Sequence, residues 1–181
     1  MKIALDPYMH RHLDLPGICR LTKELGYDYI ELSPRADFLE WWSMPRVYPE
    51  RIAAFKKALK EYNVGLATLQ PMYRWASPLE DERQIAMRYW KKAIEVAVEM
   101  GCDTMISEFG RGGSPERTVG NPINNKESCE AAWWRSMDEL VPIFEKEGIV
   151  PDETRELGAG GLRRRRVRHR RLRGIRWGLP W

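Results

Sequence analysis

The feature that most constrains this chain is a repeated unit, shown most clearly by Gly101–Gly110, with the sequence GCDTMISEFG. A helical pattern ends at Gly101, and Thr104–Ile106 is typical of a buried strand. Ser107 and Glu108 follow at the carboxyl end of that strand, before a glycine-rich loop. Strands that alternate with helices form parallel sheets, whose chemistry lies at the carboxyl ends of the strands. The unit therefore predicts an α/β protein with Glu108 at its functional edge.

The same unit occurs three times before this stretch and begins once after it. Strands are expected at 2–6, 27–33, 64–69 and 104–106 and from Ile149, and helices at 14–25, 49–62, 78–100 and 126–147. A (β/α)8 barrel needs about 250 residues, so four complete strand–helix units and the start of a fifth correspond to its first half. No G-x-G-x-x-G motif follows the first strand, as a dinucleotide-binding sheet would require. We therefore expect a parallel (β/α) fold of the TIM-barrel type, present as a partial barrel over residues 1–150.

Several local signals predict where elements begin and end. Asp14 is placed to cap the first helix. Glycines end three of the expected helices, at positions 26, 101 and 148. The run from Ser77 to Glu80, SPLE, has the capping-box pattern, in which the serine oxygen accepts from the Glu80 amide. Pro151 lacks the amide that a central strand needs, which argues against a complete fifth strand.

Composition limits the class of protein. Hydrophobic residues make up 43% of the 181 residues and charged residues 31%, which is typical of a globular protein. No apolar run approaches the roughly 20 residues of a membrane-spanning helix. The first residues hold Asp6 and Pro7, where a signal peptide needs an unbroken apolar stretch. Three scattered cysteines without CxxC spacing suit a reducing compartment, so we expect a cytoplasmic protein without a membrane partner.

The end of the chain differs from the rest. Residues 158–181 hold nine arginines and no acid, whereas residues 1–157 carry a net charge of −5. Such a tail is typical of a disordered, solvated segment or of a nucleic-acid arm. A third interpretation is a frameshift product, because CGN arginine codons read one base later encode Val, Ala, Asp or Gly. We expect residues 151–181 to be an irregular basic tail, either disordered or frameshift-derived.

Four segments at the expected strand ends carry a family resemblance: IALDPYMHRHL, IELSPR, LQPMYRW and GCDTMISEF. They resemble the sugar phosphate isomerase/epimerase family, which are xylose isomerase-like TIM barrels distantly related to endonuclease IV. The resemblance covers residues 1–150 and implies an enzyme that uses a divalent metal (Mn, Mg, Co or Zn). It implies proton transfer next to the carbonyl of a sugar or sugar phosphate. The family's metal ligands lie near the ends of strands five to eight, and none can be carried onto this chain.

Two acids are the first candidates for contact with substrate. Glu31 and Glu108 end the second and fourth expected strands, on the catalytic face of a barrel. A carboxylate there can act as a base or accept a bond from a sugar hydroxyl. The alternative is a solvated acid or an ion pair with a nearby arginine, such as Arg35 or Arg111.

Histidines follow the first strand. His10 and His12 could bind a metal together with Asp6, but two histidines without a clear third ligand are weak support for a metal site. A loop histidine that contacts a sugar hydroxyl is the simpler interpretation, and His10 is the candidate.

The loop after the third strand supplies Tyr73, Arg74 and Trp75. Aromatic faces stack on sugars and arginine pairs with phosphate, so we predict substrate contacts here, with loop packing as the alternative. The pair Trp41-Trp42 is expected either to line the pocket or to pack at the barrel mouth. Tryptophans at 90, 133 and 134 have core spacing and are expected to be structural.

The leading hypothesis is a sugar isomerase or epimerase, with no catalytic residue assigned. One alternative is a non-catalytic fragment that forms homo-oligomers through exposed strand edges. The other is a nucleic-acid enzyme of the endonuclease IV kind. The acidic body argues against a nucleic-acid partner.

Overall fold

A computed structural model describes residues 3–40, 43–108 and 126–154 of the chain. In this part of the chain five parallel strands form one sheet in the order β1-β2-β3-β4-β5. Their bounds are β1 Ala4–Leu5, β2 Tyr29–Leu32, β3 Gly65–Leu69, β4 Thr104–Glu108 and β5 Val150–Thr154. Strands that follow one another in both sequence and space, each joined by a helix, are the arrangement of a TIM barrel. The predicted parallel α/β fold is confirmed.

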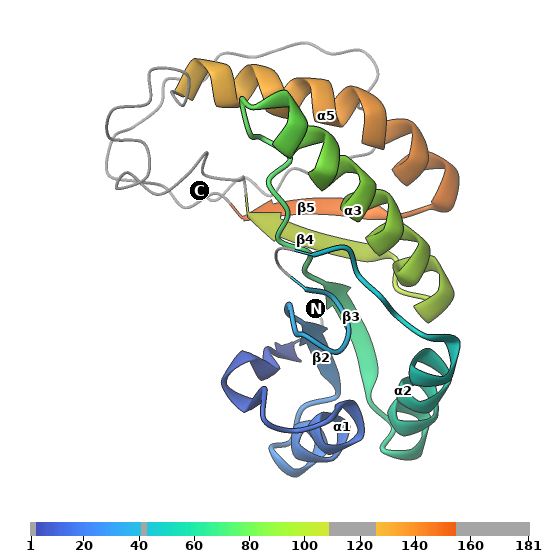
Figure 1. Ribbon diagram of the computed structural model, residues 1–181. Helices are drawn as coiled ribbons and strands as arrows, with labels where there is room; N and C mark the ends of the chain where they lie inside the picture. The colour runs from blue at the N-terminus through green and yellow to red at the C-terminus, as the bar shows by residue number, and fades with distance from the viewer. Residues whose placement is uncertain (1–2, 41–42, 109–125, 155–181) are drawn as a thin grey trace.

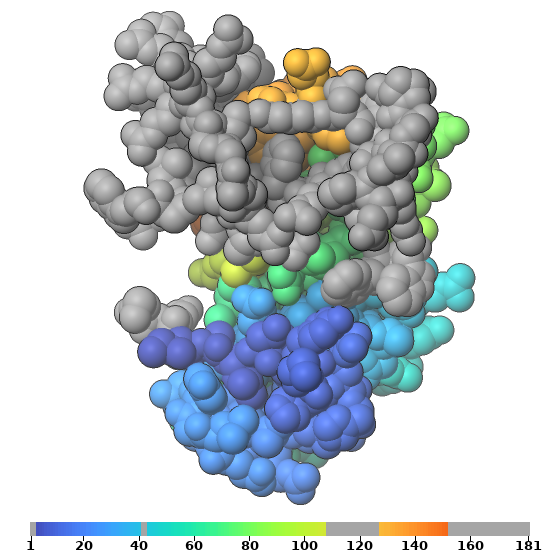
Figure 2. Space-filling model, turned by 90° about the vertical axis from the view of Figure 1, so that its left-hand side faces the viewer, coloured from blue at the N-terminus to red at the C-terminus, as the bar shows by residue number. Residues whose placement is uncertain are grey.

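The helices form an arc on the outside of the sheet (Figure 1). They are α1 Leu15–Glu24, α2 Pro49–Glu61, α3 Glu80–Met100 and α5 Lys126–Glu147, with a short 3-10 helix η1 Pro7–His10 after β1. Figure 2, which views the molecule from the left of Figure 1, has the first βα units at one end and α5 at the other. Each predicted strand and helix lies within a few residues of its expected position. Among the described residues, no helix has the length and apolar character needed to cross a membrane.

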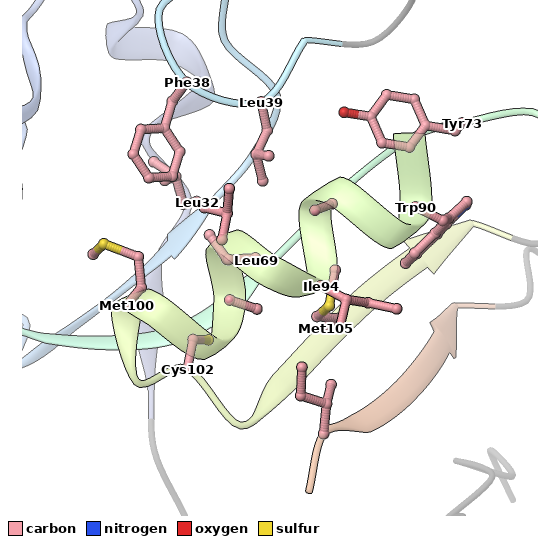
Figure 3. Packing of buried hydrophobic residues seen from close by; sticks show 14 of the residues in the cluster. Leu32, Phe38, Leu39, Leu69, Tyr73, Trp90, Ile94, Met100, Cys102 and Met105 are labelled. Atoms are coloured by element: carbon pink, nitrogen blue, oxygen red, sulfur yellow. The ribbon is translucent and has the colours of Figure 1, made fainter. Parts of the chain in front are cut away.

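The hydrophobic core lies between the sheet and the helices. Ile30 and Leu32 of β2, Leu69 of β3 and Met105 of β4 are at most 1% exposed. Figure 3 shows several of these strand residues beside the side chains of α3. The helices contribute, among others, Ile18, Phe55, Trp90, Ile94, Trp133, Leu140 and Phe144 to the same cluster. Each large apolar side chain buried in this layer contributes about 1.5–3 kcal/mol to the stability of the fold. The packing of this layer therefore holds the sheet against the helices.

Two predicted helix ends are confirmed. The Asp14 carboxylate accepts a 2.8 Å hydrogen bond from the Gly17 amide and caps α1. Gly101 ends α3 in the left-handed conformation, with φ of 68°. A residue with a Cβ is strained at that φ, which explains why glycine ends the helix.

The predicted capping box is wrong. Helix α3 begins at Glu80, and the Ser77 hydroxyl accepts from the Leu79 amide at 3.2 Å rather than from Glu80. The same hydroxyl donates to the Glu82 carboxylate at 2.9 Å. The Glu80 side chain is held by Arg83 instead, at 2.6 and 2.9 Å, so it does not reach back to Ser77.

Strand β5 runs further than the sequence predicted, through Pro151 to Thr154. The Val150 amide donates to the Asp103 carbonyl at 2.8 Å. Amides alternate in direction along a strand, so position 151 directs its backbone nitrogen away from β4. The proline therefore removes no hydrogen bond from the β4–β5 pairing. Asp152 and Glu153 belong to this strand.

Replacing Gly101 tests the backbone argument. An added Cβ at Gly101 meets no atom within 4 Å, so the penalty of Gly101→Ala comes from the backbone alone. We expect Gly101→Ala to lower the free energy of unfolding by about 1 kcal/mol, and Gly101→Asn by less, because asparagine tolerates this conformation better. Urea unfolding measures both. Equal stability of the two variants and the wild type would contradict the assignment.

Candidate active site

Glu31 lies on the inner face of the sheet, near the carboxyl end of β2. Along this strand Ile30 and Leu32 are buried toward the helices, whereas Tyr29 and Glu31 alternate with them and are half-buried. The register between β2 and β3 shifts after Ile30, so Ala67 is an extra residue in β3. This bulge places Thr68 opposite Glu31. The Thr68 hydroxyl donates a 3.0 Å hydrogen bond to the Glu31 carboxylate.

The surroundings of Glu31 favour its protonated form. Burial is the largest cause and raises the pKa of this carboxyl group, the Thr68 hydrogen bond lowers it in part, and the charge of Asp6 raises it further. Asp6 follows β1 and caps η1, where its carboxylate accepts from the Tyr8 amide at 3.0 Å. A half-buried carboxyl with a raised pKa is suited to hold and transfer a proton.

Arg35 does not pair with Glu31, so the alternative of an ion pair between them is not found in the structure. Arg35 is 8% exposed and forms a two-point ion pair with Asp37. It also donates to the Leu13 carbonyl at 2.8 Å, which ties the loop after β2 to the start of α1. Burial would raise the pKa of Asp37, but the hydrogen bonds and charge of Arg35 outweigh it and hold that pKa below its usual value. Arg35 is therefore structural, and Glu31 keeps Thr68 as its partner.

The histidines lie beside this edge without forming a metal site. The rings of His10 and His12 are 6.1 Å apart, His10 at the end of η1 and His12 on the following turn. Among the side chains that the structure describes, which do not include those of Glu108, Asp152 and Glu153, no three His, Cys, Asp or Glu lie close enough to hold a metal ion. His10 and His12 therefore lack a third ligand among the described side chains, and the divalent metal stays an expectation from the family resemblance.

Of the three candidate residues in the loop after β3, two are buried and one is exposed. Tyr73 is 3% and Trp75 1% exposed, and the Trp75 ring stacks on Trp90 with centroids 4.1 Å apart. Arg74 is exposed and pairs with Glu82 at 3.3 Å. The packing interpretation thus describes both aromatic rings, and neither ring face is open to solvent. A substrate contact from any of the three stays a prediction.

Other predicted positions are only partly described. Glu108 is the last residue of β4 and lies opposite Thr154 of β5 in register, but its side chain is outside the described structure. Its neighbour Ser107 is buried and donates to the Pro71 carbonyl at 3.0 Å, joining the end of β4 to the loop after β3. Trp41-Trp42, Arg111 and the basic tail from residue 155 also lie outside the described residues.

A buried arginine network that the sequence did not reveal supports this edge. Arg83 of α3, 3% exposed, binds the carboxylates of Glu80 and of Glu139 on α5. It also donates to the Ser136 hydroxyl at 3.1 Å, which in turn donates to the Trp75 carbonyl at 2.6 Å. Hydrogen bonds from Arg83 first, and from Gln84, lower the pKa of Glu80 to about 2. The network joins α3, α5 and the loop after β3, partners that no local sequence pattern brings together.

Comparison with known proteins shows the family of this chain. The profile of the xylose isomerase-like TIM barrel family matches residues 19–151, most of the chain. The chain belongs to this family. The predicted family resemblance is confirmed. No protein of curated function matches the sequence.

Solved structures of the same fold resemble this member of the family at low sequence identity. The 3-keto-D-glucoside 4-epimerase YcjR from E. coli is 18% identical with a TM-score of 0.63, over 84% of this chain and 55% of that protein. A D-psicose 3-epimerase from Clostridium cellulolyticum H10, solved with D-tagatose, is 14% identical with a TM-score of 0.64, over 84% and 52%. A xylose isomerase-like TIM barrel protein from Mycobacterium smegmatis, in complex with magnesium, is 14% identical with a TM-score of 0.59, over 84% and 54%. The chain thus spans about half the length of these proteins.

The Arg83 network predicts a large loss of stability on substitution. Arg83→Met keeps the apolar stem but removes the donor to Ser136 and the buried donor to the Glu80 and Glu139 carboxylates. Hydrogen bonds to charged groups contribute about 1.5–3 kcal/mol each, so we expect the free energy of unfolding in urea to fall by at least about 2 kcal/mol. Arg74→Met is the matched control, because its ion pair is exposed and such pairs contribute at most about 1 kcal/mol. Equal losses in both variants would contradict the network.

The raised pKa of Glu31 predicts a pH dependence of stability. The folded state binds the proton of this carboxyl more tightly than the unfolded chain does. The contribution of this group to stability is therefore lost as the pH rises from the ordinary pKa of glutamate through the raised pKa of the folded state. Glu31→Gln removes the charge, and we expect it to be more stable than the wild type at pH 7 but not at pH 4. Thr68→Val, which removes the donor to the charged form, should steepen the wild-type slope. Urea unfolding between pH 4 and pH 7 measures these slopes, and a Glu31→Gln variant that is less stable at pH 7 would contradict the assignment.

Proposed function

We propose that this chain contributes the substrate-binding first half of a sugar isomerase or epimerase that transfers a proton next to a carbonyl. The observation that carries the proposal is Glu31, a half-buried carboxyl on the inner face of a TIM-type sheet, with a raised pKa and one hydroxyl partner. The structural neighbours act on or bind sugars, which supports the same class of substrate. The family membership supports the fold on which such chemistry occurs.

In this proposal the residues of the described half have separate roles. Glu31 holds a proton or accepts a bond from a sugar hydroxyl, and Thr68 fixes the orientation of its carboxylate. His10, at the neighbouring strand end, contacts a second hydroxyl, and Glu108 ends β4 on the same edge. Tyr73, Arg74 and Trp75 complete the loop beside them.

The divalent metal of the family enters this proposal only as a property of the whole enzyme. One neighbour was solved with magnesium, and the described side chains of this chain hold no group of three ligands, so no step is assigned to a metal. The substrate is a small sugar or sugar phosphate, and the protein is expected to act in the cytoplasm without nucleic acid or membrane partners.

Sugar binding by this chain tests the proposal. We expect D-tagatose, the sugar held by one structural neighbour, to give saturation-transfer NMR signals with the chain. Glu31→Gln should weaken binding about tenfold, as expected for loss of one hydrogen bond to a charged group. Glu24→Gln is the control, because Glu24 lies at the exposed end of α1 on the helical side. Absence of a signal, or equal weakening by both variants, would contradict the proposal.

A second candidate is self-association as a non-catalytic fragment. In the described sheet β1 and β5 are the outermost strands, each paired on one side. Unpaired strand edges are templates for pairing with another chain, so a homo-oligomer would form through them. Sedimentation velocity distinguishes the two: a monomer that binds sugar supports the first candidate, and an oligomer that does not bind sugar supports the second.

A further inference from the structure

Tyr73 carries a buried hydroxyl that lacks a hydrogen-bond partner. The residue is 3% exposed, and its hydroxyl oxygen makes no hydrogen bond to any residue that the structure describes. Buried polar atoms are nearly always paired in folded proteins, because an unpaired one loses its bond to water without replacement. This hydroxyl therefore marks a place where an interaction is missing.

The ring of Tyr73 is fixed by its aromatic neighbours. Tyr89 and Trp90 of α3 meet it edge-on, with centroids 5.3 and 6.3 Å away. The ring cannot turn without breaking these contacts, so the direction of its hydroxyl is set. In Figure 3 that hydroxyl points to the side of the core where Leu39 lies.

Glu40, which follows Leu39, is the complementary group. Leu39 is fully buried and accepts from the Arg35 amide at 2.8 Å, and the Phe38 amide donates to the Arg35 carbonyl at 3.1 Å, so a compact turn presents Glu40. Glu40 is half-buried, and among the described residues no hydrogen bond or ion pair engages its carboxylate. Burial first, and then the negative charge of Glu40, raise the pKa of the Tyr73 phenol.

We propose that the Tyr73 hydroxyl donates a hydrogen bond to the Glu40 carboxylate, directly or through one water molecule, and latches the loop after β2 onto the loop after β3. Tyr73 supplies a buried donor without a partner among the described residues, and Glu40 supplies a half-buried acceptor whose negative charge acts on the Tyr73 phenol. The two loops border the sheet edge that holds Glu31, so the latch joins them at that edge. The proposal does not depend on the proposed function.

A double-mutant cycle in the full chain tests the latch. We expect Tyr73→Phe to raise the unfolding equilibrium constant in urea about tenfold or more, the effect of losing a hydrogen bond to a charged acceptor. Glu40→Ala should have a similar effect, and the double variant should be no less stable than either single variant. Tyr89→Phe is the matched control, because it removes a hydroxyl from the neighbouring, half-buried ring, and its effect should be less than twofold. Additive effects, or a Tyr73→Phe variant as stable as the wild type, would overturn the proposal.

Amide hydrogen exchange gives a second, local readout. The Arg35 and Phe38 amides are bonded within the turn that presents Glu40. In Tyr73→Phe their exchange should accelerate more than that of the amides in β4, and in Tyr89→Phe it should not. Acceleration spread equally over the turn and β4 would mean a general loss of stability and would overturn the latch.

Discussion

The structure depends on one constraint, which is that a parallel sheet must be covered by the helices that connect its strands. Each crossover returns the chain to the same edge of the sheet, and the helix that makes it buries one side of the strands. Ile30, Leu32, Leu69 and Met105 form the strand side of this layer, and they are almost fully buried. With that side committed to packing, the alternate residues of each strand are left for the inner face. Leu32 and Leu69 pack in the core on the helical side of the sheet. Because side chains alternate along a strand, Glu31 and Thr68 beside them lie on the inner face.

The carboxyl edge is held by interactions between loops and helices rather than within single elements. Arg83 of α3 binds Ser136 of α5, and Ser136 in turn donates to the Trp75 carbonyl. Ser107 joins β4 to the loop after β3. Arg35 ties the loop after β2 to the start of α1. Buried, charge-assisted hydrogen bonds of this kind are costly to break one partner at a time, so they keep the loops that border Glu31 in fixed positions.

Sequence reasoning succeeded where the signal is local and failed where partners come from distant parts of the chain. The helical spacing of apolar residues, the Asp14 cap and the helix end at Gly101 are decided by neighbours a few residues away. The prediction of a capping box was wrong because the Glu80 side chain pairs with Arg83. Arg83 is held in turn by Glu139, which lies on α5, far away in the sequence. Pro151 was misjudged because its effect depends on which side of the strand is paired, which the sequence does not state.

By itself the sequence determined the class of fold and the position of Glu31 at a strand end, because hydrophobic period and glycine placement follow from backbone geometry. It also carried the family resemblance, which the family profile bears out over residues 19–151. Only the tertiary structure decided that Thr68, rather than Arg35, is the partner of Glu31, since a one-residue bulge in β3 sets that register. It also decided that the rings of Tyr73 and Trp75 face the core, since burial depends on the packing of helices far away in sequence.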